Sequence, residues 1–262
     1  MKVGTPASPE LPTISVLTVC RNAATNVRAT VESVVRQTYP NVEYIVMDGA
    51  STDGTLALLR SFDSKIAQLV SEEDAGIYDA MNKALERASG DFVCFLNAGD
   101  TFASEDTLTS LAPLLRDADL VYGDAYFVDP SGKRLGLRSE LTPHRLPQRL
   151  RREDFLTGMP FCHQSCLARR ALCPPYDLRF RVSADIDWLL KIVSSTYRYR
   201  RSDEAIANFQ TGGFSNKNWS RSLRERFAIL VRHFGYAATT ASHVRIFARR
   251  FAHLLKGGDL RQ

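Results

Sequence analysis

Short apolar runs alternate with amphipathic helical stretches over the first 130 residues of the chain. Uncharged, β-branched runs such as Ile14–Cys20 are typical of strands buried on both faces, and the stretches between them repeat apolar residues at helical spacing. This alternation favours an α/β fold, with a mostly parallel sheet flanked by helices. The predicted strands lie at 14–20, 43–47, 66–70 and 92–96, and the predicted helices at 25–37, 52–62, 77–88 and 106–115.

The pattern becomes irregular after residue 123. A turn signal, Asp129-Pro130-Ser131-Gly132, predicts a hairpin over Ala125–Arg138. Helical periodicity returns at Ala184–Ser194, and two basic amphipathic helices are predicted at the end of the chain. A length of 262 residues fits one large domain with an appendage.

Charge divides the chain into two unlike halves. Residues 1–130 hold 9 Lys and Arg against 19 Asp and Glu, whereas residues 131–262 hold 25 against 10. An acidic half can coordinate cations, and a basic half can meet phosphates or an anionic membrane surface. We do not expect a nucleic-acid partner, because no recognised module is present and the acidic half would repel phosphates.

The five cysteines indicate the cellular compartment. They are unevenly spaced and form no CxxC pair, so reduced thiols in a cytoplasmic protein are expected rather than a zinc site or disulfides. Met1–Pro12 is polar and lacks the apolar core of a signal peptide. No run of 18 apolar residues occurs, which predicts a soluble or peripheral protein.

Three acidic residues follow predicted strands, where open parallel sheets bind ligands. They are Asp48, Asp74 and Asp100. The alternative is that each only caps a helix or orders a turn. No GxGxxG or GxxxxGK[ST] motif is present, so NAD binding and P-loop ATPase activity are not expected. Carboxylates and a divalent cation could still hold a nucleotide.

Several segments together carry a family resemblance. PTISVLTVCRN (12–22), VMDGASTDGT (46–55), EDAGIYDAMN (73–82) and GDFVCFLNAGD (90–100) resemble, in order and spacing, the family 2 glycosyltransferases. The similarity is greatest to bacterial exopolysaccharide, colanic-acid-type and glycolipid enzymes. It continues through Cys162-His163-Gln164, Ser183-Ala184-Asp185 and Gly212-Gly213-Phe214-Ser215, and so covers residues 12–216.

The resemblance implies a GT-A fold, with a mostly parallel Rossmann-like sheet. It implies a nucleotide-sugar-binding half (12–124) and an acceptor-side half (125–216), which would follow a disordered lead-in (1–11) and precede a basic helical extension (217–262). The residues that the resemblance assigns to the nucleotide-sugar donor are Thr18, Cys20, Arg21, Asn22, Asp48, Ser51, Asp74, Gly76, Ile77, Asp79 and Lys83. Asp79 and Lys83 are also spaced as an i,i+4 ion pair, which would need no ligand.

The metal motif departs from the family pattern. Many relatives carry Asp-x-Asp-Asp where this chain has Asn97-Ala98-Gly99-Asp100. Mg²⁺ needs only one or two carboxylates beside substrate phosphates, so Asp100 remains the expected ligand of Mg²⁺ or Mn²⁺. Asn97, Ala98 and Gly99 are expected to line the donor site.

Inverting sugar transfer needs a base for the acceptor hydroxyl. Asp185 and Asp187 begin the helix predicted at 184–194 and point to different sides, and the resemblance assigns the base to Asp185. Ser183 is the expected N-cap, and Asp187 suits a helix N-terminus. The resemblance also gives His163 a catalytic role at the diphosphate or acceptor, although a lone His in an uncharged stretch is often a core residue.

Residues 219–262 carry nine Lys and Arg against two acids, interleaved with apolar residues. Such helices can lie on an anionic bilayer or pack as a structural cap. The sequence therefore predicts an inverting, hexosyltransferase-type enzyme that uses a UDP-sugar and a glycan or lipid-linked acceptor at the inner face of the cytoplasmic membrane. The alternatives are a catalytically silent nucleotide-sugar-binding subunit and a sugar-phosphate nucleotidyltransferase.

Overall fold

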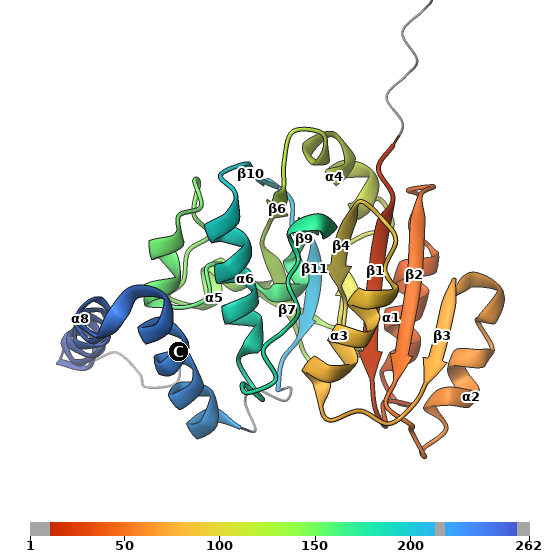
Figure 1. Cartoon of the computed structure of the whole chain (residues 1–262), viewed down its shortest axis with the longest axis horizontal. Coiled ribbons are helices and arrows are strands. Elements are labelled where there is room, and N and C mark those ends of the chain that lie inside the picture. Colours follow the sequence, from red (N-terminus) through yellow and green to blue (C-terminus); the bar gives the residue numbers. More distant parts are fainter. Residues whose placement is uncertain (1–10, 213–217, 256–262) are drawn as a thin grey trace, which may run out of the picture.

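A computed structural model of the chain describes residues 11–212 and 218–255, with side-chain surroundings to residue 246 (Figure 1). Its larger sheet has seven strands in the order β10-β6-β9-β4-β1-β2-β3. All neighbouring pairs are parallel except those of β9, which runs antiparallel to β4 and β6. These strands are β1 (Ile14–Cys20), β2 (Val42–Asp48), β3 (Gln68–Ser71), β4 (Phe92–Phe95), β6 (Leu120–Tyr122), β9 (Cys166–Arg169) and β10 (Tyr199–Arg201).

Helices cover both faces of this sheet (Figure 1). Every residue of β1 is buried, and alternate side chains enter opposite cores: Leu17 packs with α3 and α6, whereas Val16 packs with α1, α2 and α4. The expected α/β architecture is therefore correct. The helices are α1 (Val27–Val35), α2 (Thr55–Arg60), α3 (Ile77–Arg87), α4 (Thr107–Leu115), α5 (Arg138–Leu141) and α6 (Ala184–Ser195).

A second, smaller sheet packs beside the first, with the order β5-β11-β7-β8. Its members are β5 (Thr101–Phe102), β7 (Ala125–Val128), β8 (Arg134–Leu137) and β11 (Ala207–Gln210). The predicted hairpin is present as the antiparallel pair β7–β8. The sequence did not reveal β5, β6, β9, β10 or β11, because these strands are short and pair with residues far away in the chain.

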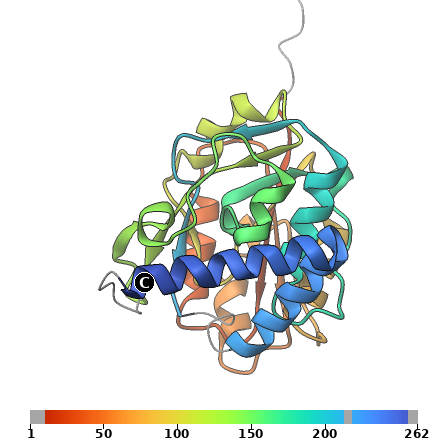
Figure 2. The same ribbon diagram turned by 90° about the vertical axis from the view of Figure 1, so that its left-hand side faces the viewer.

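The last described helix, α8 (Trp219–Leu255), is two helices joined at Gly235, where φ is +79°. This agrees with the two predicted basic helices. Figure 2 shows the second one lying across one side of the molecule. Ile229 and Leu230 of the first one are buried in the core beside α6. No helix within the described ranges is long and apolar enough to cross a membrane.

Some expectations fall on other parts of the chain. The lead-in at 1–10, the Gly213-Phe214-Ser215 part of the last motif and the end at 256–262 lie outside the described residues.

Candidate active site

The exits of β1 and β2 form the first part of the candidate site. Cys20 and Asp48 are paired as the last residues of the two strands. The Asp48 carboxylate is buried and accepts hydrogen bonds from the Ser51 amide (3.0 Å), the Ser51 hydroxyl and the Ser71 hydroxyl (2.6 Å). Burial and the nearby Asp48 charge raise the pKa of Cys20, so this residue stays a neutral thiol.

Asn22, which follows β1, forms hydrogen bonds with the segment that follows β2. Its backbone amide donates to Ser51 Oγ (2.7 Å), and its side-chain oxygen accepts from the Thr52 amide (2.9 Å). Asn22 adopts a left-handed backbone conformation, with φ +50°, which this residue type tolerates well. The structure therefore brings together Cys20, Asn22, Asp48 and Ser51, as the sequence predicted.

The segment before α3 closes over the same edge of the sheet. Asp74 Oδ1 accepts from the Gly76 amide (2.8 Å). A Cβ at Gly49 would overlap Asp74 Oδ2 and lie 3.3 Å from carbon atoms of Arg21. Asp74, Gly49 and Arg21 are thus close neighbours, and only a glycine at position 49 leaves room for this arrangement.

Lys83 is held by the acidic residues around it. Its ammonium lies 3.0 Å from Glu72 and 3.5 Å from Asp79, and it donates to the Glu73 carbonyl oxygen (2.7 Å). The hydrogen bond to Glu72 raises the pKa of Lys83. The expected i,i+4 pair with Asp79 is present. Ile77, at the start of the helix, is half-buried against the core.

Asp100 occupies a buried polar niche. It accepts hydrogen bonds from Gln164 Nε2 and from the Gln210 amide, both at 2.9 Å. Burial raises the pKa of Asp100 to about 7. Gly99 has φ +102°, and its amide donates to the Thr30 hydroxyl (3.0 Å). Ala98 is half-buried and packs against the core.

The niche offers oxygen donors to a divalent cation. The buried Asn97 Oδ1 has no hydrogen-bond partner in the described part of the chain. Each Asp100 oxygen retains a free lone pair beside its one hydrogen bond. No group of three or more His, Cys, Asp or Glu side chains that could hold a metal occurs among residues 11–212 and 218–246. The residues present therefore fit a cation such as Mg²⁺, which accepts few protein ligands and keeps other oxygens from substrate and water.

Two expected site residues are core residues instead. Thr18 is fully buried, and its hydroxyl donates to the Leu96 carbonyl oxygen (2.7 Å), so its side chain cannot contact a donor. His163 is 5% exposed, and its Nε2 lies 2.7 Å from the Tyr176 hydroxyl. Burial lowers the pKa of His163 to about 4, so the imidazole is neutral. The ring packs against Phe95 and Trp188, as in the core-residue alternative, and the catalytic role expected for His163 stays a prediction.

Asp185 lies in the first turn of α6 and is partly exposed. Its Oδ1 accepts from the Ile186 amide (3.0 Å) and lies 3.2 Å from the Tyr78 hydroxyl. No described residue hydrogen-bonds Oδ2. Burial raises the pKa of Asp185 to about 6, which is the range in which a carboxylate is an effective base near neutral pH.

Asp187 has a different role. It is fully buried, lies 2.8 Å from His233 Nε2 and 2.7 Å from Lys191 Nζ, and so joins α6 to α8. Ser183 occupies the N-cap position of α6 without making a side-chain cap. The expected N-cap position of Ser183 is confirmed, but its hydroxyl lies beside Ser222 of α8 (3.1 Å) and does not cap the helix.

Three carboxylates lie within electrostatic reach of Cys162. Burial raises the pKa of Cys162 to about 12, and the charges of Asp100, Asp124 and Asp185 add to this effect. Asp124 was missed in the sequence, although it follows the strand at 120–122 and the rule of strand exits could have found it.

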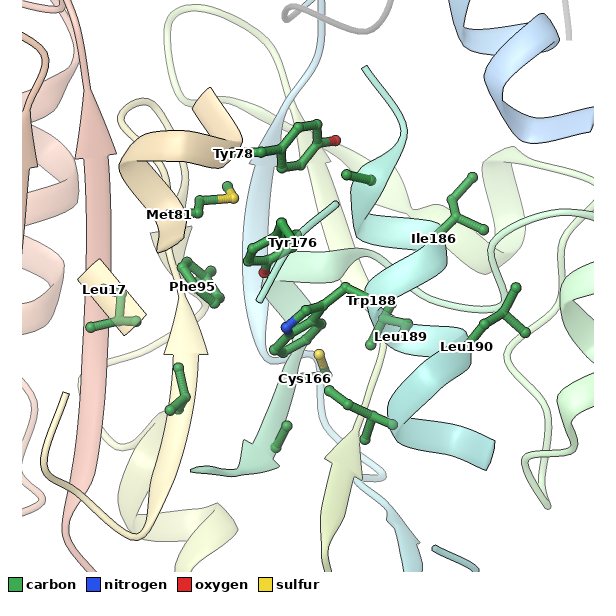
Figure 3. Packing of buried hydrophobic residues seen from close by; sticks show 14 of the residues in the cluster. Leu17, Tyr78, Met81, Phe95, Cys166, Tyr176, Ile186, Trp188, Leu189 and Leu190 are labelled. Atoms are coloured by element: carbon green, nitrogen blue, oxygen red, sulfur yellow. The ribbon is translucent and has the colours of Figure 1, made fainter. Parts of the chain in front are cut away.

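The sequence also missed three residues that hold others in place. Tyr78 lies against Asp185, and Gln164 and Gln210 contact Asp100. Figure 3 shows Tyr78 beside Tyr176 and Trp188 between α3 and α6, and the consecutive rings are stacked at 5.4 and 5.2 Å. Tyr78 and Gln164 stood in recognised motifs, whereas Gln210 did not.

A large polar cleft adjoins this region. It has a volume of about 1060 Å³ and lies between the smaller sheet and the segment that follows α5. Asp124, Tyr126, Arg134, Glu140, Arg145 and Arg201 are among its lining residues. The Nε atom of Arg201 is buried without a partner in the described residues.

Comparison with known proteins gives consistent results. Residues 15–173 match the family described as Glycosyl transferase family 2. The PGL/p-HBAD biosynthesis glycosyltransferase of Mycobacterium bovis BCG is 31% identical over 233 residues, which cover 84% of this chain and 86% of the relative. The putative teichuronic acid biosynthesis glycosyltransferase TuaG of Bacillus subtilis is 40% identical over 97 residues, or 36% of this chain and 38% of TuaG.

Solved structures share the fold. TarS (residues 1–349) of S. aureus has a TM-score of 0.68 and 18% identity, over 92% of this chain and 72% of that chain. The mannosyltransferase PcManGT of Pyrobaculum calidifontis, solved with GDP-Man and Mn²⁺, has a TM-score of 0.68 and 21% identity, over 96% of this chain and 77% of that chain. The GT-A fold expected from the sequence is thereby confirmed.

Proposed function

Because the chain belongs to glycosyl transferase family 2 and is a transferase enzyme, we propose that it moves a hexose-type sugar from a UDP-sugar to an acceptor hydroxyl with inversion. The observation that carries this proposal is the position of Asp185. Its partly exposed carboxylate lies 3.2 Å from the hydroxyl of Tyr78, in the helix that follows the Asp74–Gly76 loop at the strand exits, where nucleotides bind in such sheets.

The donor occupies the exits of β1, β2 and β4 in this proposal. The carboxylate of Asp74 and the side chain of Arg21 lie where they can bind the nucleotide, and the buried Asp48 carboxylate orders Ser51 and Ser71 beside them. The other residues of the donor site are Cys20, Asn22, Gly76, Ile77, Asp79, Lys83, Asn97, Ala98 and Gly99. UDP is the favoured nucleotide because TarS has been solved with UDP and with UDP-GlcNAc. GDP-sugars should also be tested as donors, because PcManGT has been solved with GDP-Man.

Asp100 and Asn97 would hold the Mg²⁺ or Mn²⁺ ion. A cation bound there supplies positive charge for the diphosphate of the donor. The protein contributes a niche in which Gln164 and the Gln210 amide fix the Asp100 carboxylate.

Asp185 acts as the general base. Its Oδ1 is fixed by Ile186 and Tyr78, which leaves Oδ2 to accept the proton of the acceptor hydroxyl. The hydroxyl oxygen then forms a bond to the anomeric carbon while the bond from that carbon to the diphosphate breaks. Attack from the side opposite the leaving nucleotide inverts the anomeric configuration.

A glycan or lipid-linked acceptor fits the polar cleft beside Asp124. Its carboxylates and arginines can hydrogen-bond sugar hydroxyls, and its volume of about 1060 Å³ accommodates several sugar units. The names of two relatives, in PGL/p-HBAD and teichuronic acid biosynthesis, support a cell-surface glycan or glycolipid product. Arg145→Ala should raise the acceptor KM and leave donor hydrolysis unchanged.

The exposed side of α8 would contact an anionic membrane surface. Trp219, Leu223, Tyr236, Val244 and Ile246 are exposed there together with Arg224 and Arg245. The predicted contacts through Phe247 and Phe251 concern side chains outside the described ones. Ile229 and Leu230 belong to the core, so the first helix serves as a structural cap on that side.

The competing function is a catalytically silent nucleotide-sugar-binding subunit. Asn97 and Gly99, which stand where many relatives have carboxylates, favour it. The nucleotidyltransferase alternative lacks the Gly-rich basic loop that it would need after β1.

One experiment separates these functions. The purified protein is incubated with UDP-glucose, UDP-galactose, UDP-GlcNAc, GDP-mannose and TDP-rhamnose, with and without Mn²⁺, and the released nucleotide is measured. Slow hydrolysis of one donor supports a transferase. Binding of UDP without turnover of any donor supports the silent subunit.

A further inference from the structure

Glu225 of α8 contacts the segment immediately before the candidate base. Its Oε1 accepts from the Arg181 amide (3.0 Å), and its Oε2 accepts from the amides of Val182 (2.8 Å) and Ser183 (3.0 Å). Glu225 is 8% exposed, and Arg221 of the same helix lies 3.1 Å from Oε1. A buried carboxylate that accepts three amide protons makes strong, charge-assisted hydrogen bonds.

These bonds anchor the segment that leads into α6. The N-cap residue Ser183 makes no side-chain cap on α6, and the amides of Val182 and Ser183 would otherwise be buried without partners. A negative charge at this end of a helix is also favourable. Glu225, more than forty residues away in sequence, therefore fixes the backbone that enters the helix carrying Asp185.

The same segment is held from the donor side. The Arg181 guanidinium donates to the Ala75 carbonyl oxygen, in the loop between Asp74 and Gly76. The Tyr78 hydroxyl lies 2.9 Å from the Val182 carbonyl oxygen. Residues 181–185 are thus fixed between the donor-side loop and α8, and removal of either contact leaves the other to set the position of Asp185.

A second residue of α8 also acts on the base. Arg226 is half-buried, and its positive charge lowers the pKa of Asp185, against the larger effect of burial. Two successive residues of the C-terminal helix therefore influence the start of α6. Asp185, Glu225 and Arg226 all lie beyond the residues that match the family, 15–173.

We propose that Glu225 is a positioning residue that holds the Arg181–Ser183 backbone so that Asp185 faces the acceptor hydroxyl. This inference rests on the proposed function of Asp185 as the base. Displacement of a catalytic group by about 1 Å can lower turnover roughly 10²-fold, so the loss should appear in kcat rather than in donor binding.

The test compares Glu225→Gln and Glu225→Ala with the wild-type protein. The substrate is the donor hydrolysed fastest in the five-donor panel above. We expect kcat to fall about tenfold in the first variant, which keeps one acceptor oxygen, and roughly 10²-fold in the second. The donor KM should stay within about twofold. Hydrogen exchange at the amides of Arg181, Val182 and Ser183 should accelerate in both.

Two matched variants separate positioning from general stability. Ala228→Ser changes an exposed position one turn further along the same helix and should leave kcat and exchange unchanged. His233→Ala removes another polar contact between α6 and α8, at Asp187, and should lower the thermal midpoint without accelerating exchange at 181–183. If His233→Ala reproduces both the kcat loss and the faster exchange, Glu225 is only structural and the proposal is wrong.

A double-mutant cycle tests the route through the base. If Glu225 acts through Asp185, Glu225→Gln should not slow an Asp185→Asn protein any further. Additive losses would overturn the proposal, and so would an unchanged kcat in a folded Glu225→Gln protein. Normal turnover of Asp185→Asn would instead refute the base assignment, whereas an inactive Asp185→Asn protein with an unaffected Glu225→Gln protein refutes only the positioning role.

Discussion

Tyr78 and Asp185 meet where α3 approaches α6: the Tyr78 hydroxyl lies 3.2 Å from Asp185 Oδ1. Tyr78 belongs to the helix that follows the donor-side loop, and Asp185 begins the helix that carries the candidate base. Burial and the Asp185 charge raise the pKa of Tyr78, so this hydroxyl remains a proton donor at neutral pH. The contact connects the donor site directly to the base.

Asp185→Asn tests the base. The amide keeps the size of the carboxylate and can still accept a hydrogen bond, but it cannot take the acceptor proton. Turnover should fall roughly 10²–10⁴-fold while UDP affinity, measured by calorimetry, stays unchanged. Asp187→Asn is the comparison, since this residue joins α6 to α8, and it should lower thermal stability more than turnover. The reverse pattern would move the assignment to Asp187.

The pH profile gives a separate test. Burial raises the pKa of Asp185 to about 6, and only its ionised form accepts a proton. Activity should therefore be full above this pKa and fall about tenfold per pH unit below it. The measurement is kcat from pH 4.5 to 8 at saturating donor and acceptor. A profile that is flat down to pH 4.5 contradicts the assignment.

Asp100→Ala tests the cation. This change removes the one carboxylate of the Asn97–Asp100 segment, so Mn²⁺ should no longer strengthen UDP binding. Calorimetric titrations of UDP with and without Mn²⁺ measure the difference. Asp117→Ala, an exposed change elsewhere, should keep the full Mn²⁺ effect. Full activity of the wild-type protein in excess chelator would disprove the metal requirement.

Gly49→Ala tests the approach of Asp74. A methyl group at position 49 would overlap Asp74 Oδ2 and press on Arg21. Donor affinity should drop about tenfold or more, because a shift of Asp74 disturbs both the loop and the neighbouring arginine. Gly132→Ala adds a methyl group in open space in the β7–β8 turn and should lower stability only. Equal donor affinity in both variants would remove Asp74 from the donor site.

Vesicle binding tests the exposed face of α8. Reversing Arg224 and Arg245 to Glu should weaken sedimentation with anionic vesicles more than about tenfold, since each basic residue near such a surface contributes about 1 kcal/mol. Salt at 1 M, where screening acts within about 3 Å, should abolish binding of the wild-type protein. The control is the double variant in which Arg36 and Arg60, both exposed on the nucleotide-binding half, are changed to Glu. Equal binding by both double variants would leave α8 as a structural cap.

Local patterns in the sequence were sufficient for most of the nucleotide-binding half. The strand at Ile14–Cys20 was predicted with its actual bounds. The helix predicted at 77–88 ends one residue earlier, at Arg87. The strand is a continuous apolar run and the helix has a regular apolar period, so the local sequence alone indicates each element. Asp48 and Asp74 could be found because Asp48 ends β2 and Asp74 follows β3 after a short linker.

The sequence was less informative wherever distant segments pair. The two-residue strand β5 exists only because it pairs with β11, more than a hundred residues later. His163 and Thr18 were assigned to the site by their motifs, yet both lie in the interior. A motif gives the order of the residues, but it does not show whether each side chain points into the core or into the binding site.

The sequence by itself determined the α/β class, the strand exits with their carboxylates and the family resemblance, because these depend on local periodicity and on residue types at short spacing. The tertiary structure alone decided which groups are buried and which meet. Desolvation raises the pKa of Asp185 and lowers that of His163. Glu225 reaches the start of α6 only after α8 has packed on the core, since burial and contact depend on residues that the chain brings together by folding.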